Sequence, residues 1–331
     1  MQNALTEKLA RTRLSSLKKT AILLPLISLF ALSSCAPLAA AATSGYAQGA
    51  LQAASPAATA GAVSPLAKGV TMVCGGITEP TGDYPGPGKG VFTEDVFGNL
   101  WWCASGAATK IATIPAGAPG GQAYQYMAGV ETKDGLVLVL SDTDNDGMWF
   151  CNGATSSGCG STSQFTKFGV TDSPEGIAMD KELNVYVVMF HAHKIYKCTE
   201  ASSYQACSVY QKLSGTGSPR GLAMDSKGNT WVSDAACTGY VWNDGAIVNS
   251  SENFGDVWTI AVSTANPSKT LHVYLGLSHG CTSGNAGVYD LTDGQALPTN
   301  IQGFDLLFGL TTKLQYSAYN AGVVYSVKDT V

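Results

Sequence analysis

The sequence predicts an all-β fold, a six-bladed β-propeller closed by an N-terminal strand. Three observations support this prediction: two segments align 45 residues apart, four weaker copies of the same pattern occur, and glycine and aromatic residues are frequent. Of the 331 residues, 38 are glycine, and only 13% are charged. This composition indicates short strands joined by tight turns, and it differs from that of a coiled coil or a disordered chain.

Residues 1–34 are predicted to be an export signal. Five basic residues and one acid, Glu7, precede an apolar run of twelve residues over 21–32. That run is too short to span a bilayer, which needs about 20 residues, but it suits the core of a signal peptide. It ends in Leu32-Ser33-Ser34-Cys35, which resembles the bacterial lipobox. The alternative is ordinary cleavage within the alanine run at 39–42.

The lipobox resemblance implies a membrane anchor through lipidated Cys35. Ala36 follows the cysteine in place of the aspartate that retains lipoproteins at the inner membrane, so the outer membrane is expected, on its periplasmic or surface side. Residues 35–68 are rich in alanine, serine and glycine, with Lys68 as the one charge, and predict a flexible tether. Loss of a leader of net charge +4 takes the formal charge from −5 to −9. An acidic chain without a basic patch is not expected to bind nucleic acid.

Residues 69–331 form the repetitive body. The two best copies are Pro174–Val188 and Pro219–Ser233, and each has two alternating apolar runs around an Asp-x-x-x-Asn turn, which is typical of a β-hairpin. Weaker copies begin at Val91, Gly129, Thr259 and Gly309. Six copies of about 40 residues suit six four-stranded blades. The last copy ends after a third strand at 323–327, and residues 69–74 are expected to supply its outer strand. An open β-sandwich is the alternative.

The repeat pattern resembles the NHL repeat, strongly at 174 and 219 and partially elsewhere over residues 88–331. Gluconolactonase-type propellers are the enzymes most similar to this pattern. The resemblance implies a calcium ion held by Asn and Asp at the residue before the repeat glycine in two blades. Glu175 and Arg220 occupy those positions here. Arginine has only donors and cannot be a ligand, so this departure counts against a metal-dependent lactonase.

Eight cysteines follow Cys35, and an even number in an exported chain predicts disulfides. Cys151 with Cys159, and Cys198 with Cys207, occupy matching places and are expected to join strands three and four of their blades. Cys237 and Cys281 fall in equivalent loops of neighbouring blades and could form a bridge between them. Cys74 and Cys103 remain, and would tie the closing strand to the first blade. These spacings are not those of a zinc knuckle.

One rim of the propeller gathers the polar candidates. The inner strand of each blade starts at this rim, and the loop between strands two and three returns to it. The residues before the repeat glycine are aligned as Gly90, Ala128, Glu175, Arg220, Trp258 and Phe308. We expect ligand binding by Glu175, Arg220, Trp258 and Phe308, with His279 from a nearby loop. The alternative is a purely structural ion pair between Glu175 and Arg220.

Two loops on this rim are candidate metal sites. Asp142, Asp144 and Asp146, followed by Gly147, resemble the start of a calcium loop, but Gly153 stands where the closing glutamate belongs. His191 and His193 would point to one side of an extended segment, and Asp144 and Asp146 could complete a zinc or copper site. A polar turn and a surface loop are the respective alternatives. His272 is expected to lie in a strand with a structural role.

These observations predict a lipid-anchored, extracytoplasmic propeller that binds a small polar ligand or an envelope protein at the channel mouth without catalysis. The second interpretation is a metal-dependent lactonase or lyase on the same scaffold, with calcium as its cofactor. The third is a structural envelope protein. The chain has no Gly-x-Ser-x-Gly elbow, so an α/β-hydrolase is not indicated.

Overall fold

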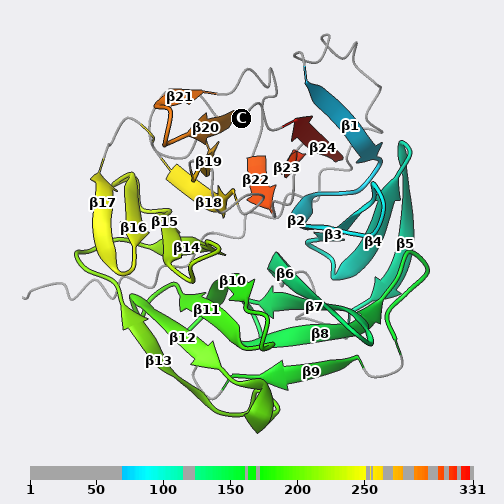
Figure 1. Ribbon diagram of the computed structural model, residues 1–331, viewed down its shortest axis with the longest axis horizontal. Helices are drawn as coiled ribbons and strands as arrows, with labels where there is room; N and C mark the ends of the chain where they lie inside the picture. Colours follow the sequence, from blue (N-terminus) through cyan, green and yellow to red (C-terminus); the bar gives the residue numbers. More distant parts are fainter. Residues whose placement is uncertain are drawn as a thin grey trace, which may run out of the picture. The chain divides into compact units, whose positions relative to one another are not determined.

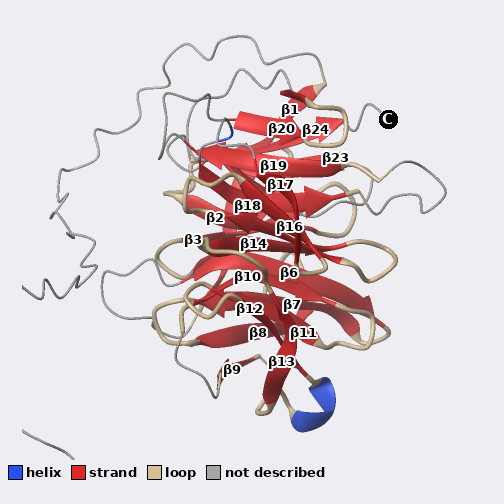
Figure 2. Cartoon of the chain, turned by 90° about the vertical axis from the view of Figure 1, so that its left-hand side faces the viewer, coloured by secondary structure: helices blue, strands red, loops and turns tan. Residues whose placement is uncertain are grey.

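Six four-stranded antiparallel sheets surround a central axis in the computed structural model, which confirms the predicted six-bladed propeller (Figure 1). The structure describes residues 69–114, 124–160, 163–168, 172–250, 254, 256–263, 271–278, 287–296, 305–308, 313–318 and 322–328. They all belong to one compact unit, residues 60–331. Within the described residues, no helix is both long and apolar enough to cross a membrane. The short 3-10 helix η1, Glu200–Ser202, projects from the third blade (Figure 2).

Each blade is an up-and-down sheet whose first strand lies innermost. The first blade contains β2 to β5, which are Pro80–Pro85, Val91–Asp95, Asn99–Ala104 and Ala107–Thr113. The second contains β6 to β9, which are Tyr124–Thr132, Gly135–Asp142, Gly147–Ala154 and Gln164–Lys167. The third contains β10 to β13, which are Pro174–Met179, Val185–Met189, Lys194–Cys198 and Cys207–Lys212.

The other three blades follow the same plan. The fourth contains β14 to β17, which are Pro219–Met224, Thr230–Asp234, Tyr240–Asn243 and Ala246–Ser250. The fifth contains β18 to β21, which are Asp256–Val262, Val273–Ser278, Gly287–Asp290 and Gln295–Ala296. The sixth contains β22 to β24, which are Asp305–Phe308, Lys313–Ala318 and Val323–Lys328, and it is completed by β1, Val70–Gly75.

The N-terminal strand closes the ring, as the sequence predicted. β1 pairs antiparallel with β24 from Val70↔Val327 to Gly75↔Val323. It also reaches the first blade, since the Gly106 amide donates to the Val73 carbonyl at 2.8 Å. The sixth blade therefore has four strands and no unpaired outer edge on β24.

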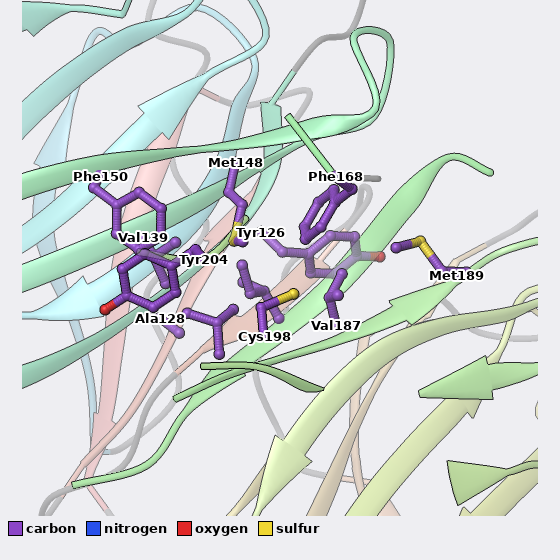
Figure 3. Packing of buried hydrophobic residues seen from close by; sticks show 12 residues of the cluster. Tyr126, Ala128, Val139, Met148, Phe150, Phe168, Val187, Met189, Cys198 and Tyr204 are labelled. Atoms are coloured by element: carbon purple, nitrogen blue, oxygen red, sulfur yellow. The ribbon is translucent and has the colours of Figure 1, made fainter. Parts of the chain in front are cut away.

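The apolar core lies between the blades. Six clusters of buried side chains occur among the described residues, and each joins one blade to the next. Figure 3 shows the cluster between the second and third blades, where Phe150 of β8 stacks on Tyr204 of the third blade with ring centroids 4.3 Å apart. Because both faces of each sheet are covered by neighbouring blades, no blade can bury its apolar surface alone.

Three disulfides join the pairs expected from the sequence: Cys74–Cys103, Cys151–Cys159 and Cys198–Cys207. Cys198 and Cys207 lie opposite each other on β12 and β13. Cys159 lies in the connection between β8 and β9, whereas the sequence predicted that it would lie in the fourth strand. Cys237 is also disulfide-bonded, and its predicted partner Cys281 lies outside the described residues.

The sequence alignment misplaced two inner strands. Val91–Trp102 was aligned with the inner hairpins at 174 and 219, but it forms β3 and β4, the second and third strands of its blade. The inner strand is β2, which begins with Pro80-Thr81-Gly82. In the sixth blade the inner strand is Asp305–Phe308, and residues 309–312, predicted for it, lie outside the described ranges.

The first error has a local cause. Asp95 accepts hydrogen bonds from the Asn99 side chain and from Trp101 Nε1, as Asp180 does from Asn184 and Tyr186. This Asp-x-x-x-Asn turn closes whichever hairpin contains it. It does not specify which two strands of a blade it joins.

Candidate binding site at the channel mouth

Glu175, Arg220 and Trp258 come from the inner strands of three consecutive blades, β10, β14 and β18. The pairing of each inner strand with its neighbour shifts at these residues, between Pro174 and Ile177, Pro219 and Leu222, and Val257 and Thr259. Such bulges redirect a side chain from the regular alternation of a strand. The three residues, which the sequence aligned with one another, therefore occupy the same structural position on three blades.

The glycine after each of the first two residues permits close contact between blades. A Cβ added to Gly176 would collide with the carbonyl oxygen of Arg220 and the backbone of Leu222. A Cβ added to Gly221 would lie 2.8 Å from Thr259 Cα. The backbones of neighbouring inner strands thus touch at this level, and this contact brings the three side chains together.

Arg220 connects the charged and aromatic parts of the site. Its Nη2 lies 3.5 Å from Glu175 Oε1, and the two side chains are 12% and 3% exposed. Its guanidinium carbon lies 4.0 Å from the ring centroid of Trp258 and 5.4 Å from that of Phe190. A guanidinium over an indole face gains cation–π attraction, which strengthens as water is excluded. The sequence did not single out Phe190, which follows β11 directly and lies on the loop that carries His191.

The pKa of Glu175 lies near neutral pH. Burial raises its pKa to about 7, the charge of Arg220 acts against this, and the nearby Asp144 carboxylate raises it further. Among the described residues, Glu175 Oε2 has no hydrogen-bond partner. The carboxyl group thus has one oxygen at Arg220 and one oxygen without a partner.

A hydrogen bond crosses the ring beside this site. The Tyr126 hydroxyl, from the second blade, donates to the Trp258 carbonyl of the fifth blade at 2.8 Å. Blades two and five stand opposite each other in a six-bladed ring. The bond therefore holds the backbone of Trp258, one of the three site residues, from the opposite side of the ring.

The acidic loop adopts a hydrogen-bonded turn. Asp142 is buried and accepts hydrogen bonds from the backbone and side-chain nitrogens of Asn145. Asp146 accepts one from the Ser173 amide, and Asp144 is exposed. Among the described residues, these three aspartates and the two histidines include no set of three with ligand atoms close enough to share a metal ion. The polar turn that the sequence allowed as an alternative accounts for the observed contacts.

His191 and His193 differ in surroundings. His191 is exposed and packs edge-on against Phe190 with ring centroids 4.8 Å apart. His193 is partly buried in a left-handed conformation with φ of 49°. The segment is a tight turn, so the extended geometry assumed for a shared metal ion does not occur.

The other predicted mouth residues occupy other positions in their strands or lie outside the described residues. His279 lies outside the described residues. Phe308 pairs with Gln315, which lies three residues before the end of β23. Ala128 pairs with Val139, which lies three residues before the end of β7. In the third blade the residue that pairs three positions before the end of the second strand is Ala178, so Phe308 and Ala128 correspond to Ala178 and not to Glu175. Gly90 precedes β3 and is not on an inner strand, so Thr81, in Pro80-Thr81-Gly82, is the equivalent of Glu175 in the first blade.

Two buried acids on the first blade were missed. Asp83 and Glu94 are 0% exposed. Burial raises the pKa of Asp83 to about 7, although the Ser317 hydroxyl donates to its Oδ2 at 2.7 Å. Burial, together with Asp95, Asp83 and Asp142, raises the pKa of Glu94 well above its usual range.

Comparisons with known proteins bear on the fold. No family model matches the chain, and no curated protein matches it. Among solved structures it is similar to a streptogramin B lyase, with 11% identity, a TM-score of 0.52, and coverage of 78% of this chain and 97% of that one. It is also similar to a gluconolactonase from Xanthomonas campestris, with 12% identity, a TM-score of 0.53, and coverage of 78% and 89%. A PQQ-bound aldose sugar dehydrogenase from Streptomyces coelicolor gives 13% identity, a TM-score of 0.54, and coverage of 78% and 97%.

The protein is thus a six-bladed β-propeller whose structural neighbours include gluconolactonase-type propellers. At these identities the similarity concerns the fold. A lyase, a lactonase and a dehydrogenase share the scaffold, so the activity of this chain has to be argued from its own mouth residues.

Proposed function

We propose that this protein is an extracytoplasmic binding propeller that holds a small anionic or polar ligand, or a group of that chemistry on an envelope protein, without catalysis. The observation that carries the proposal is Arg220, stacked on Trp258 and beside Phe190, with its guanidinium next to Glu175. Arginine presents several donors in a plane, which matches a carboxylate or phosphate, while the two rings supply apolar walls.

The composition of the site favours binding over metal-dependent catalysis. The residue before the repeat glycine is an oxygen donor in one blade, Glu175, but a cation in the next, Arg220. A metal ion held by Glu175 would be repelled by a guanidinium only 3.5 Å from the same carboxylate. Glu175 and Arg220 therefore do not fit the calcium site that the gluconolactonase resemblance implies.

The ligand proposal is tested with Arg220→Gln. Isothermal titration with acetate, benzoate and phenyl phosphate, and with neutral benzamide, measures the preference for anions. We expect at least one anion to bind wild-type protein more tightly than benzamide, and Arg220→Gln to lose about tenfold in affinity or more, which is 1.4 kcal/mol. Lys181→Gln, which removes an exposed charge on a turn of the other rim, serves as control.

Two results would contradict the proposal. One is a wild-type protein that binds none of the three anions. The other is an Arg220→Gln variant that unfolds like the wild type and keeps the full affinity for the anions.

We assign the protein to the membrane through a lipid on Cys35. The disulfides support an oxidising compartment, since such bonds persist in exported proteins. Cys35→Ser is expected to move the protein from the detergent phase to the aqueous phase of a Triton X-114 partition. Ser34→Ala, which keeps a small residue before the cysteine, should leave the partition unchanged. A Cys35→Ser protein that stays in the detergent phase would refute the anchor.

A further inference from the structure

The fifth blade carries a second group of polar side chains, on the rim opposite the mouth. His272 immediately precedes β19, Asp290 ends β20, and Asp293 lies in the turn that follows. The first strand of each blade starts at the mouth and ends at the opposite rim. The second strand therefore starts at that opposite rim, and the third strand ends there. The ligand atoms of these three residues all lie within 4.8 Å of one another, and no other described residues form such a group of three. The sequence suggested only a structural role for His272, within a strand.

Backbone hydrogen bonds hold the three residues in place. Asp290 Oδ1 accepts the amides of Thr292 at 2.9 Å and Asp293 at 3.2 Å. The Thr292 hydroxyl donates to the Leu271 carbonyl at 3.0 Å and accepts from the Val273 amide at 3.1 Å. Thr292 thereby ties the acidic turn to the residues on both sides of His272. The group is organised before any ligand arrives, which lowers the cost of binding.

The hydrogen bonding of His272 is incomplete. Its Nδ1 lies 2.8 Å from Asp290 Oδ2, and both side chains are 3% exposed. Its Nε2 is buried and has no hydrogen-bond partner among the described residues. A buried polar atom without a partner calls for a water or an ion. Nδ1 is the nitrogen that faces Asp290, so a metal ion bound by all three residues would take the place of the hydrogen bond between Nδ1 and Asp290.

Charge points to the same kind of ligand. Asp290 and Asp293 bring two carboxylates together, and the ion pairs of the described residues give neither of them a lysine or an arginine. A neutral imidazole and two carboxylates carry a charge of −2, which a divalent cation neutralises. Mixed nitrogen and oxygen ligands suit Zn²⁺, whereas Ca²⁺ and Mg²⁺ prefer oxygen alone.

We propose that His272, Asp290 and Asp293 bind a divalent transition-metal ion, Zn²⁺ in the first instance, at the rim opposite the mouth. The imidazole and the two carboxylates supply three ligands, and water completes the tetrahedron. Asp293 is exposed and gives the ion its access to a pair that is otherwise buried. The site joins the end of β20 to the start of β19, so the metal would stabilise the outer part of the fifth blade.

The test uses tag-free protein freed of metal by chelation. Isothermal titration with ZnCl₂ is expected to show one tight site, with CaCl₂ bound more weakly. Asp293→Asn should weaken Zn²⁺ binding tenfold or more, and it should also abolish the rise in melting temperature that Zn²⁺ gives the wild type. Asp134→Asn removes an exposed acid from a turn on the same rim and should change neither result.

Two further variants keep the test decisive. His191→Ala/His193→Ala removes the histidines near the mouth and is expected to keep full Zn²⁺ affinity. His272→Gln is expected to lose it, provided that its melting temperature without metal shows a folded protein. The proposal is overturned if the wild type binds no Zn²⁺, if Asp293→Asn binds Zn²⁺ as the wild type does, or if the double histidine variant removes the binding.

Discussion

Glu175 and Arg220 each offset a cost that the other would face alone. An isolated charge buried to this degree would cost several kcal/mol, and the ion pair and the aromatic faces compensate for part of that. The compensation is incomplete, because burial still raises the pKa of Glu175 to about 7. Near neutral pH a single proton therefore decides whether Arg220 is held by a carboxylate or faces a neutral acid.

The affinity for anions should therefore depend on pH. Above pH 7 the ionised Glu175 competes with an anionic ligand for Arg220, and below it the protonated group does not. Affinity for benzoate should fall as pH rises through 7, by up to about tenfold per pH unit. In Glu175→Gln it should be higher at pH 8 and nearly independent of pH. Titrations of both proteins at pH 6 and pH 8 measure this, and equal pH dependence in the two would contradict it.

At the scale of the strand, the repeat motif has a packing function. Pro-x-Gly begins three inner strands, β2, β10 and β14. At Gly176 and Gly221 the glycine is where neighbouring backbones touch, whereas Gly82 faces the Glu94 side chain. Two of these segments were recognised from sequence because proline, glycine and the Asp-x-x-x-Asn turn coincide. The third, Pro80-Thr81-Gly82, lacks that turn after it and was overlooked.

Gly176→Ala should therefore destabilise the protein strongly. The added methyl group meets the backbone of Arg220 and Leu222, which cannot rotate away, so we expect a loss of about 3 kcal/mol or more in the free energy of unfolding. Gly75→Ala is the control, since its Cβ would lie 3.6 Å from Val323 in ordinary contact, and a change within about 1 kcal/mol is expected. Urea denaturation compares the two. Equal stability of both variants would show that the blades separate easily at this level.

Sequence reasoning succeeded where the signal was local or periodic. The blade number, the closing strand and three of the four disulfide pairs follow from repeats and spacing, and Glu175, Arg220 and Trp258 share one position in them. It failed where distant segments decide the outcome. The surroundings of Glu94, which include Asp142, and the bond from Tyr126 to Trp258 depend on how strands from different blades come together.

For the whole molecule, closure of the ring depends on contacts between its two ends. β1 pairs with β24, and the disulfide Cys74–Cys103 joins β1 to β4 of the first blade. Cys74 and Cys103 are both fully buried, so the bond forms part of the core between the sixth and first blades. The ring is held by hydrogen bonds on one side of the closing strand and by a covalent bond on the other.

Removal of this disulfide should be more damaging than removal of a disulfide within a blade. Cys74→Ala/Cys103→Ala opens a loop of 29 residues and leaves β1 held by β24 and by the hydrogen bond from Gly106, whereas Cys198→Ala/Cys207→Ala opens one of 9. Each disulfide is worth about 2–4 kcal/mol, and more for a longer loop. Thermal unfolding should give a larger decrease in melting temperature for the first variant. An equal or smaller decrease would mean that β1 is held mainly by its pairing with β24.

The closing strand also determines how the domain would bear tension. A pull on the chain ahead of Val70, as from a membrane anchor, would meet the pairing Val70↔Val327 first and break the hydrogen bonds of β1 one after another. This peeling would stop at Cys74, where the covalent link passes the load to β4 in the first blade. Mechanical force on the tether would thus be taken by a sulfur–sulfur bond before it could open the ring.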